Sequence, residues 1–341
     1  MGCSDEHANQ AADVLIKADL RGIDSHGVAR LTGYVRLWEK SRINAQPDIQ
    51  IVHETPTTAT VDGDAGPGLI TAPFAMQIAI KKAEQYGSGW VAVRNSNHFG
   101  IAGYHALMAV EKDMIGYAVT NASPLVAPTF SNERMLGTNP VCYAIPAGKY
   151  PPVVIDMATS AAANGKLEIA QRLGKQVPEG WIQDAEGNFT TDPHALKVGG
   201  SLLPLGSDRE HGSHKGFGLS AMVDIFSGVL SGANYGPWVP PFVAFLEPSA
   251  NPVGKGIGHF VGAMRVDGFR PVEEFKLHMD NWITRFKSAS AIDPLQKVII
   301  PGEPELEAET DRKQNGIPLV DAVVNDLNEL AGKFQIPTLS S

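Results

Sequence analysis

The chain of 341 residues has little cysteine and no long apolar run. Cys3 and Cys142 are its only cysteines, which excludes a disulfide framework and is typical of a reducing compartment. No stretch approaches the ~20 apolar residues that a membrane helix needs. The polar, acidic start of the chain also has no apolar signal core. These absences predict a cytoplasmic protein that does not enter a membrane.

The usual nucleotide-binding motifs are missing as well. There is no Walker A loop, and no G-x-G-x-x-G follows a predicted strand. The segment Gly216-Phe217-Gly218-Leu219-Ser220-Ala221 fits a looser form of that motif. However, His214 and Lys215 precede it where a Rossmann fold has an apolar strand. Motifs alone therefore do not predict a dinucleotide-binding domain.

Positive charge is the scarcer sign, with 28 Lys and Arg against 37 Asp and Glu and a net charge of −9. That balance argues against a nucleic-acid-binding surface. It also means that an anionic substrate must be captured by a local basic site, because the overall field repels it. The length permits two or three domains with a sizeable core, and the composition, with 43% hydrophobic residues, is that of a globular protein.

The most informative segment is Asp24-Ser25-His26-Gly27-Val28-Ala29-Arg30, with Tyr34 four residues further on. On a single helix, His26, Arg30 and Tyr34 would project from one face. An imidazole exchanges protons near neutral pH, and a guanidinium grips a carboxylate with two parallel hydrogen bonds. Such a face suits a small 2-hydroxy or 2-oxo acid, with Ser25 and Tyr34 as further hydrogen-bonding groups. The alternative is an ordinary helix start, with Asp24 as N-cap.

A second candidate, His98, lies where a predicted buried strand ends and a predicted helix begins. The strand starts near Gly89, and the helical pattern covers residues 101–112. Open α/β folds place ligand chemistry at such strand ends. The alternative is that the polar residues 95–97 only cap the helix and that His98 is an ordinary loop histidine.

The rest of the pattern predicts helices toward both ends of the chain and strands in the middle. Predicted helices cover 8–21, a segment around His26, 73–86, 101–112, 215–230, 272–286 and 318–334. Predicted strands cover 58–62, 114–120, 141–145, 152–157, 259–265 and 298–300, with irregular structure over 175–205. We therefore expect an α+β fold. In it, residues 1–50 and 270–341 form a helical domain and residues 51–269 form a mixed central domain.

Six motifs carry a resemblance to a known family. They are Ala18-Asp19-Leu20-Arg21-Gly22-Ile23-Asp24-Ser25-His26-Gly27, Asn95-Ser96-Asn97-His98-Phe99-Gly100, Gly137-Thr138-Asn139-Pro140, Asp156-Met157-Ala158-Thr159-Ser160, His214-Lys215-Gly216-Phe217-Gly218 and Pro301-Gly302-Glu303-Pro304-Glu305. With these motifs, in this order, the chain resembles the non-Rossmann malate/L-lactate dehydrogenase family. That family also contains ureidoglycolate and sulfolactate dehydrogenases and diketogulonate and cyclic-imino-acid reductases. The motifs span nearly the whole chain.

The resemblance implies the family's own non-Rossmann fold and hydride transfer between NAD, or alternatively NADP, and a small 2-hydroxy or 2-oxo acid. Malate is the first choice of substrate, and ureidoglycolate, L-lactate, sulfolactate or a cyclic imine are the alternatives. His98 is the first candidate for the general acid/base and His26 the second, with Arg30 as the carboxylate clamp. The implied cofactor contacts are Ser123, Asp156, Met157, Ala158, Lys215, Gly302, Glu303 and Pro304.

The resemblance also implies a homodimer with the active site near the subunit boundary. The apolar and aromatic segment 235–242 agrees with this, because such surface is usually covered by a partner. Its alternative is a loop packed within one subunit. The sequence departs from the family at Asn164-Gly165-Lys166, where an arginine often precedes Gly-Lys.

Three other classes are weaker. Asp24-Ser25-His26 suggests a hydrolase, but adjacent side chains point in different directions and no G-x-S-x-G elbow exists. His211-Gly212-Ser213-His214 suggests a metal site, but this spacing without a carboxylate is no recognised ligand set, and we expect no metal. A non-catalytic binding protein of the same fold would differ in showing no absorbance change of NAD(P)H.

Overall fold

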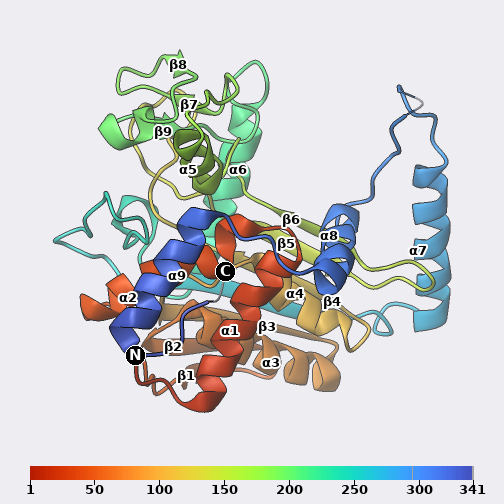
Figure 1. Cartoon of the computed structure of the whole chain (residues 1–341). Coiled ribbons are helices and arrows are strands. Elements are labelled where there is room, and N and C mark those ends of the chain that lie inside the picture. The colour runs from red at the N-terminus through yellow and green to blue at the C-terminus, as the bar shows by residue number, and fades with distance from the viewer. Residues whose placement is uncertain (294, 340–341) are drawn as a thin grey trace.

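A seven-stranded mixed sheet forms the centre of the computed structural model, which describes residues 1–293 and 295–339 (Figure 1). The strand order is β1–β2–β3–β10–β4–β5–β6. Their bounds are β1 Gln50–Glu54, β2 Thr58–Gly66, β3 Ser88–Ser96, β4 Met114–Thr120, β5 Val141–Ile145, β6 Val153–Met157 and β10 Ile257–Arg265. β2 and β3 are parallel, and the other neighbouring strands are antiparallel.

The strand directions bring the carboxyl ends of β2, β3, β4 and β6 to one edge of the sheet. β10 runs antiparallel to both of its neighbours, β3 and β4, and β5 runs antiparallel to β4 and β6. In register, Ile257 pairs with Ser96 at the end of β3, and Val141 pairs with Met157 at the end of β6. The segments that follow β3, β4 and β6 therefore leave the sheet on the same side.

Small residues let two helices pack closely on one face of this sheet. These helices are α3 (Gly68–Tyr86) and α4 (Ala102–Val110), and alanines dominate their buried side. A Cβ at Gly116 of β4 would lie 1.9 Å from the carbonyl oxygen of Ala106. On the other face, Val223 of α6 (Ser213–Asp224) packs with Tyr117, Val119 and Val141. α6 continues into a π-helical turn, Ile225–Val229.

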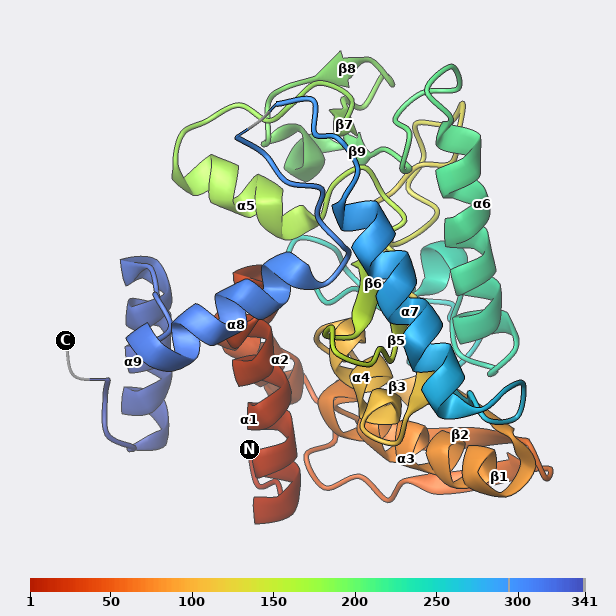
Figure 2. The ribbon, with the colours of Figure 1, turned by 90° about the vertical axis from the view of Figure 1, so that its right-hand side faces the viewer.

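The two ends of the chain meet in a helical layer (Figure 2). α1 (Asp5–Leu20) packs against α8 (Glu303–Asn315), and α2 (Leu31–Glu39) packs against α9 (Asp321–Phe334). Glu309 joins α8 to α1, because its carboxylate lies 2.6 Å from Lys17 Nζ and 3.4 Å from Arg21 Nη1. The predicted meeting of both chain ends is therefore present, while the domain boundaries stay a prediction.

α7 (Val272–Lys287) packs Ile283 against Val153 of β6 and Ile300. No helix in the described ranges combines the length and the apolar character needed to cross a membrane.

A small lobe has its own apolar core, which includes Leu167, Ile182, Leu196 and Leu202. It contains α5 (Asn164–Arg172) and a three-stranded sheet in the order β8–β7–β9. These strands are β7 Ile182–Gln183, β8 Phe189–Thr190 and β9 Ser201–Leu202, with a 3₁₀ helix at Ala195–Val198. The prediction of irregular structure over 175–205 is thus correct for most residues, because each strand has only two residues.

The prediction of one helix through His26, Arg30 and Tyr34 is wrong. Two 3₁₀ helices, Asp24–His26 and Val28–Arg30, precede α2. The extended backbone of Gly27 separates them. A Cβ at Gly27 would lie 1.9 Å from Asp19 Oδ1, and the Val28 N–H donates to Asp19 Oδ2 at 2.8 Å. The buried Asp19 carboxylate therefore accepts the Val28 N–H in place of the backbone carbonyl oxygen that would accept it in a continuous helix.

The C-terminal half of the helical layer differs from the prediction in two places. Residues 298–300, predicted as a strand, pair with no strand among the described residues. Residues 303–315, for which no helix was predicted, form α8. Gly302 takes the N-cap position at φ +96°, and Pro304 lies in the first turn, where its missing N–H costs no helical bond. β1 was also not predicted from the sequence.

The joint between the two chain ends gives a stability prediction. Replacing Glu309 by Ala leaves the nearly buried Arg21 without its carboxylate, and an unpaired buried charge is costly. We expect Glu309→Ala to lower the free energy of unfolding by about 2 kcal/mol or more in urea denaturation. Exposed Glu307 lies on the same helix. Glu307→Ala should change stability by less than ~0.5 kcal/mol. Equal effects of the two variants would contradict the structural role of Glu309.

Candidate active site

Two histidines and a tyrosine meet at the carboxyl end of β3. His98 comes two residues after the strand, and Tyr34 reaches it from α2. The Tyr34 hydroxyl lies 2.6 Å from His98 Nδ1, and the rings of His26 and His98 stack with centroids 5.6 Å apart. His26, Tyr34 and His98 therefore converge, although His26 and Tyr34 do not share one helix.

The alternative that residues 95–97 cap α4 does not hold for Asn97. Its amide donates instead to the carbonyl oxygen of Ala65 at 2.9 Å, and α4 has no side-chain cap. Asn97 thus ties the segment before His98 to the end of β2. Asp24 is likewise no helix cap, since its carboxylate pairs with Arg312 of α8.

Phe242 forms one wall of the site and was missed by the sequence analysis. Its ring stacks on His98 with a centroid separation of 4.6 Å and meets Tyr34 edge-on at 5.1 Å. The Phe242 N–H donates to Ser123 Oγ at 2.8 Å, and Arg36 donates to its carbonyl oxygen. Ser123, expected beside the cofactor, therefore holds the loop that supports His98.

The same observation revises the interpretation of segment 235–242. Val239 and Phe242 are buried within their own chain, so this loop is packed inside the subunit at these positions. A Cβ at Gly33 of α2 would lie 2.5 Å from Phe242 Cζ, which shows how closely the helix approaches the ring. No local sequence signal connects Phe242 to His98, because the contact depends on two distant loops.

Burial keeps both histidines uncharged near neutral pH. The pKa of His26 is lowered to about 4, first by desolvation and then by the nearby Arg30 charge, while Glu168 opposes the shift. The pKa of His98 is also held well below its usual value by desolvation and then by the neighbouring His26 and Arg30. Each imidazole can therefore accept a proton at neutral pH.

Arg30 lies between the helical layer and the small lobe. Its Nε donates to the carbonyl oxygen of Ser25, and its Nη2 lies 2.9 Å from Glu168 Oε2 of α5. The Ser25 hydroxyl in turn lies 2.8 Å from His26 Nδ1. Glu168 was not found from the sequence, because its pairing with Arg30 depends on how α5 packs against the segment before α2.

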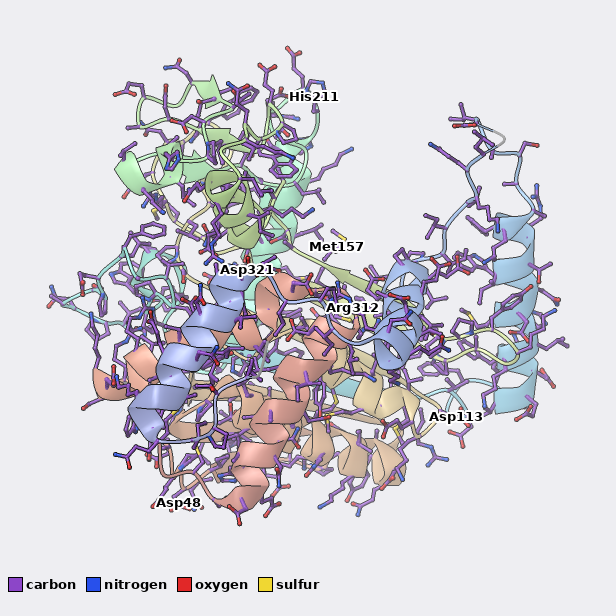
Figure 3. All side chains as sticks on the ribbon, in the orientation of Figure 1. Asp48, Asp113, Met157, His211, Arg312 and Asp321 are labelled. Atoms are coloured by element: carbon purple, nitrogen blue, oxygen red, sulfur yellow. The ribbon has the colours of Figure 1, made fainter. Side chains whose placement is uncertain are left out.

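Three of the expected cofactor contacts lie at the end of β6. Asp156 accepts a hydrogen bond at 2.7 Å from the N–H of Gly103, in the first turn of α4. Burial raises the pKa of Asp156 to about 6, against the lowering effect of the Gly103 hydrogen bond. Met157 and Ala158 follow as half-buried residues. Figure 3 labels Met157 where β6 runs toward the small lobe.

Three further expected contacts lie at the start of α8. Gly302 is next to β6, since a Cβ there would lie 3.0 Å from Val154 Cβ. Glu303 accepts the Ile300 N–H at 3.0 Å and pairs with Lys287, and Pro304 is exposed.

Lys215 is exposed in the first turn of α6. That helix is held near the end of β6 through Leu205, whose N–H donates to Thr159 at 3.0 Å. A Cβ at Gly216, next to Lys215, would lie 2.3 Å from Leu205 O.

The histidines 211 and 214 lie apart from this centre. His211 is on the surface of the small lobe and pairs with Asp208 at 2.8 Å (Figure 3). Over residues 1–293 and 295–339, no group of three His, Cys, Asp or Glu side chains has an arrangement that could hold a metal ion.

Comparison with known proteins identifies relatives along nearly the whole chain. Residues 1–328 match the sequence model of the family described as malate/L-lactate dehydrogenase. The chain is 44% identical over 340 residues to a malate dehydrogenase of Pyrococcus abyssi, covering 99% of this chain and 91% of that protein. It is 38% identical over 334 residues to an L-sulfolactate dehydrogenase of Methanocaldococcus jannaschii, covering 98% and 92%.

A solved structure shows the same fold. The malate dehydrogenase of Pyrococcus horikoshii superimposes with a TM-score of 0.89 at 41% identity, covering 99% of this chain and 91% of that one. The family model and these relatives extend over nearly the whole chain, so the similarity includes the sheet, the helical layer and the small lobe. The chain belongs to the malate/L-lactate dehydrogenase family and is an oxidoreductase of the 2-hydroxyacid dehydrogenase class.

Proposed function

We propose that this enzyme interconverts malate and oxaloacetate with NAD as the cofactor. The observation that carries the proposal is the convergence of Arg30, two neutral histidines and Tyr34 at the carboxyl end of β3. The relatives named malate dehydrogenase support the choice of malate. Sulfolactate, ureidoglycolate and L-lactate are the alternative substrates, and NADP is the alternative cofactor. A cytoplasmic location stays a prediction from the sequence.

The residues around the end of β6 fit a nicotinamide dinucleotide. Asp156 offers a carboxylate that can accept ribose hydroxyls, and Lys215 offers a cation that can offset phosphate charge. Gly302 brings backbone close to β6, where a side chain would meet Val154. A nicotinamide bound there would supply the hydride chemistry at C2 of the substrate. The remaining proposed cofactor contacts are Met157, Ala158, Ser123, Glu303 and Pro304.

The protein's own part in the reaction is orientation and proton transfer. Arg30 holds the substrate carboxylate, which orients C2 and its oxygen. His98 exchanges the proton of that oxygen through Nε2, because its Nδ1 is engaged with Tyr34. The Tyr34 hydroxyl can donate to Nδ1, or accept from it and donate to the His98 carbonyl oxygen at 3.3 Å. The Gly100 N–H also donates to Nδ1 at 3.3 Å, which favours the tautomer with its proton on Nε2, the form that can donate to the carbonyl oxygen of oxaloacetate. His26 is the second candidate for this role.

The clamp is tested by substitution of Arg30. Arg30→Ala should raise KM for oxaloacetate strongly and leave the cofactor Kd nearly unchanged, since a charge-assisted pair of this kind contributes ~2–4 kcal/mol of binding. Arg30→Lys should restore only part of the affinity, because an ammonium lacks the fork. Steady-state kinetics and cofactor titration measure both. A kcat/KM within a few-fold of wild type for Arg30→Ala would place the clamp elsewhere.

The proton-transfer role is tested at the histidines. His98→Ala should lower kcat by about 10²–10⁴-fold, the usual loss when a general acid/base is removed. In the wild-type enzyme, malate oxidation needs a neutral histidine, so its acid limb should lie below the ordinary histidine value of 6.5. That limb should be absent in His98→Ala. Near-normal turnover in His98→Ala together with loss of turnover in His26→Ala would reverse the assignment.

We further propose a homodimer, supported by exposed apolar side chains on α6 and the π-helical turn. These are Leu219, Ile225, Phe226, Val229 and Leu230, with exposed fractions of 37%, 50%, 37%, 52% and 58%. A contiguous apolar patch usually marks an interface, and a two-fold dimer buries the same patch on each subunit.

Light scattering should show a dimer at micromolar concentration, and dissociation should abolish activity. Leu230→Glu should shift the protein toward the monomer, because the patch would acquire two charges across the two-fold axis. Val198→Glu, at an exposed position of the small lobe, is the control and should leave the dimer intact. A fully active monomer of 36.4 kDa would refute the proposal.

A further inference from the structure

The guanidinium of Arg30 already has an internal carboxylate partner. Glu168 Oε2 lies 2.9 Å from Arg30 Nη2, and the two side chains are 32% and 20% exposed. The pair is thus neither sealed in the core nor fully in solvent. A substrate carboxylate that binds Arg30 therefore meets a guanidinium whose charge is already balanced by Glu168.

α5 is built to present Glu168 at this place. Leu167, next to it, is fully buried in the core of the small lobe and anchors the helix. Asn164, one turn earlier, donates to Glu168 Oε1 at 2.8 Å. A Cβ at Gly165 would lie 2.6 Å from Ser25 Cβ and 3.2 Å from Arg30 Nη2, so the glycine permits the close approach of α5.

We infer that Glu168 is a positioning residue that occupies Arg30 in the unliganded enzyme and sets the affinity for carboxylate substrates. It lies where the substrate carboxylate would bind and must give way to it. This inference rests on the proposed role of Arg30 as the clamp, and it adds an internal competitor for that clamp.

When the substrate carboxylate replaces Glu168, Arg30 still has a carboxylate partner, so the guanidinium charge is not left unpaired. The released Glu168 side chain can turn to solvent, because a third of it is already exposed. In the paired arrangement Asn164 donates to the other carboxylate oxygen, Oε1. The competitor lowers apparent affinity without taking part in the chemical step, so KM changes while kcat does not.

A supporting role of Glu168 would predict the opposite change in substrate affinity. If Glu168 instead held Arg30 in its binding geometry, removal of its charge would loosen the guanidinium and weaken substrate binding. The sign of the affinity change in Glu168→Gln therefore distinguishes a competitor from a support. Glu179, an exposed carboxylate in the same lobe, is a matched control for the change in net charge.

The experiment measures binding of malonate, a non-reacting dicarboxylate, by calorimetry with reduced cofactor present, and KM and kcat for oxaloacetate. Glu168→Gln should lower both the malonate Kd and the KM about three- to tenfold, with kcat within twofold of wild type. Glu179→Gln should change none of these values. An unchanged or raised Kd in Glu168→Gln would overturn the inference.

A double variant separates this inference from the proposed function. In the Arg30→Ala background, Glu168→Gln should no longer improve malonate binding, because the competition acts only through Arg30. A persistent improvement there would also overturn the inference. If Arg30→Ala weakens malonate binding but Glu168→Gln does not tighten it, the clamp stands and only the competitor role fails. If Arg30→Ala leaves malonate binding unchanged, the clamp itself fails and the inference with it.

Discussion

The shared edge of β3, β4 and β6 is the constraint on which the site depends. These strands end together only because β10 and β5 run antiparallel between them. Their carboxyl ends deliver His98, Ser123 and Asp156 from three distant parts of the chain to one side of the sheet. In a parallel Rossmann sheet, ligands lie at the carboxyl ends of the strands. The present sheet also gathers its site residues at carboxyl ends, although its topology is mixed.

The helical layer contributes His26, Arg30 and Tyr34, and a buried carboxylate fixes the turn that carries the first two. Asp19 is nearly inaccessible to solvent, and burial raises its pKa to about 6. Its carboxylate accepts the Val28 N–H and fills the space that a side chain at residue 27 would need. Arg312 of α8 donates to the Asp19 carbonyl oxygen and pairs with Asp24. The C-terminal half of the chain thus shapes the turn that carries His26 and Arg30.

Burial of the histidines links this geometry to the chemistry. The rings of Phe242 and His26 both stack on the His98 ring, and each contact removes water from the imidazole. The resulting fall in pKa keeps the base unprotonated at neutral pH. Arg36 and Ser123 hold the Phe242 backbone, so residues on two separate elements define the environment of one imidazole.

The local pattern of apolar and polar residues in the sequence determined most of the helices and strands. The alternating and apolar stretches at 114–120 and 141–145 match β4 and β5, and the helical periodicity at 272–286 matches α7. The resemblance in six motifs determined the family, because ordered motifs constrain function more strongly than composition does. The helix at 303–315 was missed, since its glycine and proline are typical of a loop and only their positions in the N-cap and first turn permit a helix.

Only the tertiary structure decided how the site is assembled. His26, Arg30 and Tyr34 reach it from two 3₁₀ helices and α2, because Asp19 captures a backbone N–H that a continuous helix would have used. The sequence analysis did not place Phe242 or Glu168 in the site, for the same physical reason. Each acts through a contact with a residue more than a hundred positions away, and hydrophobic periodicity and motif spacing report only on neighbours along the chain.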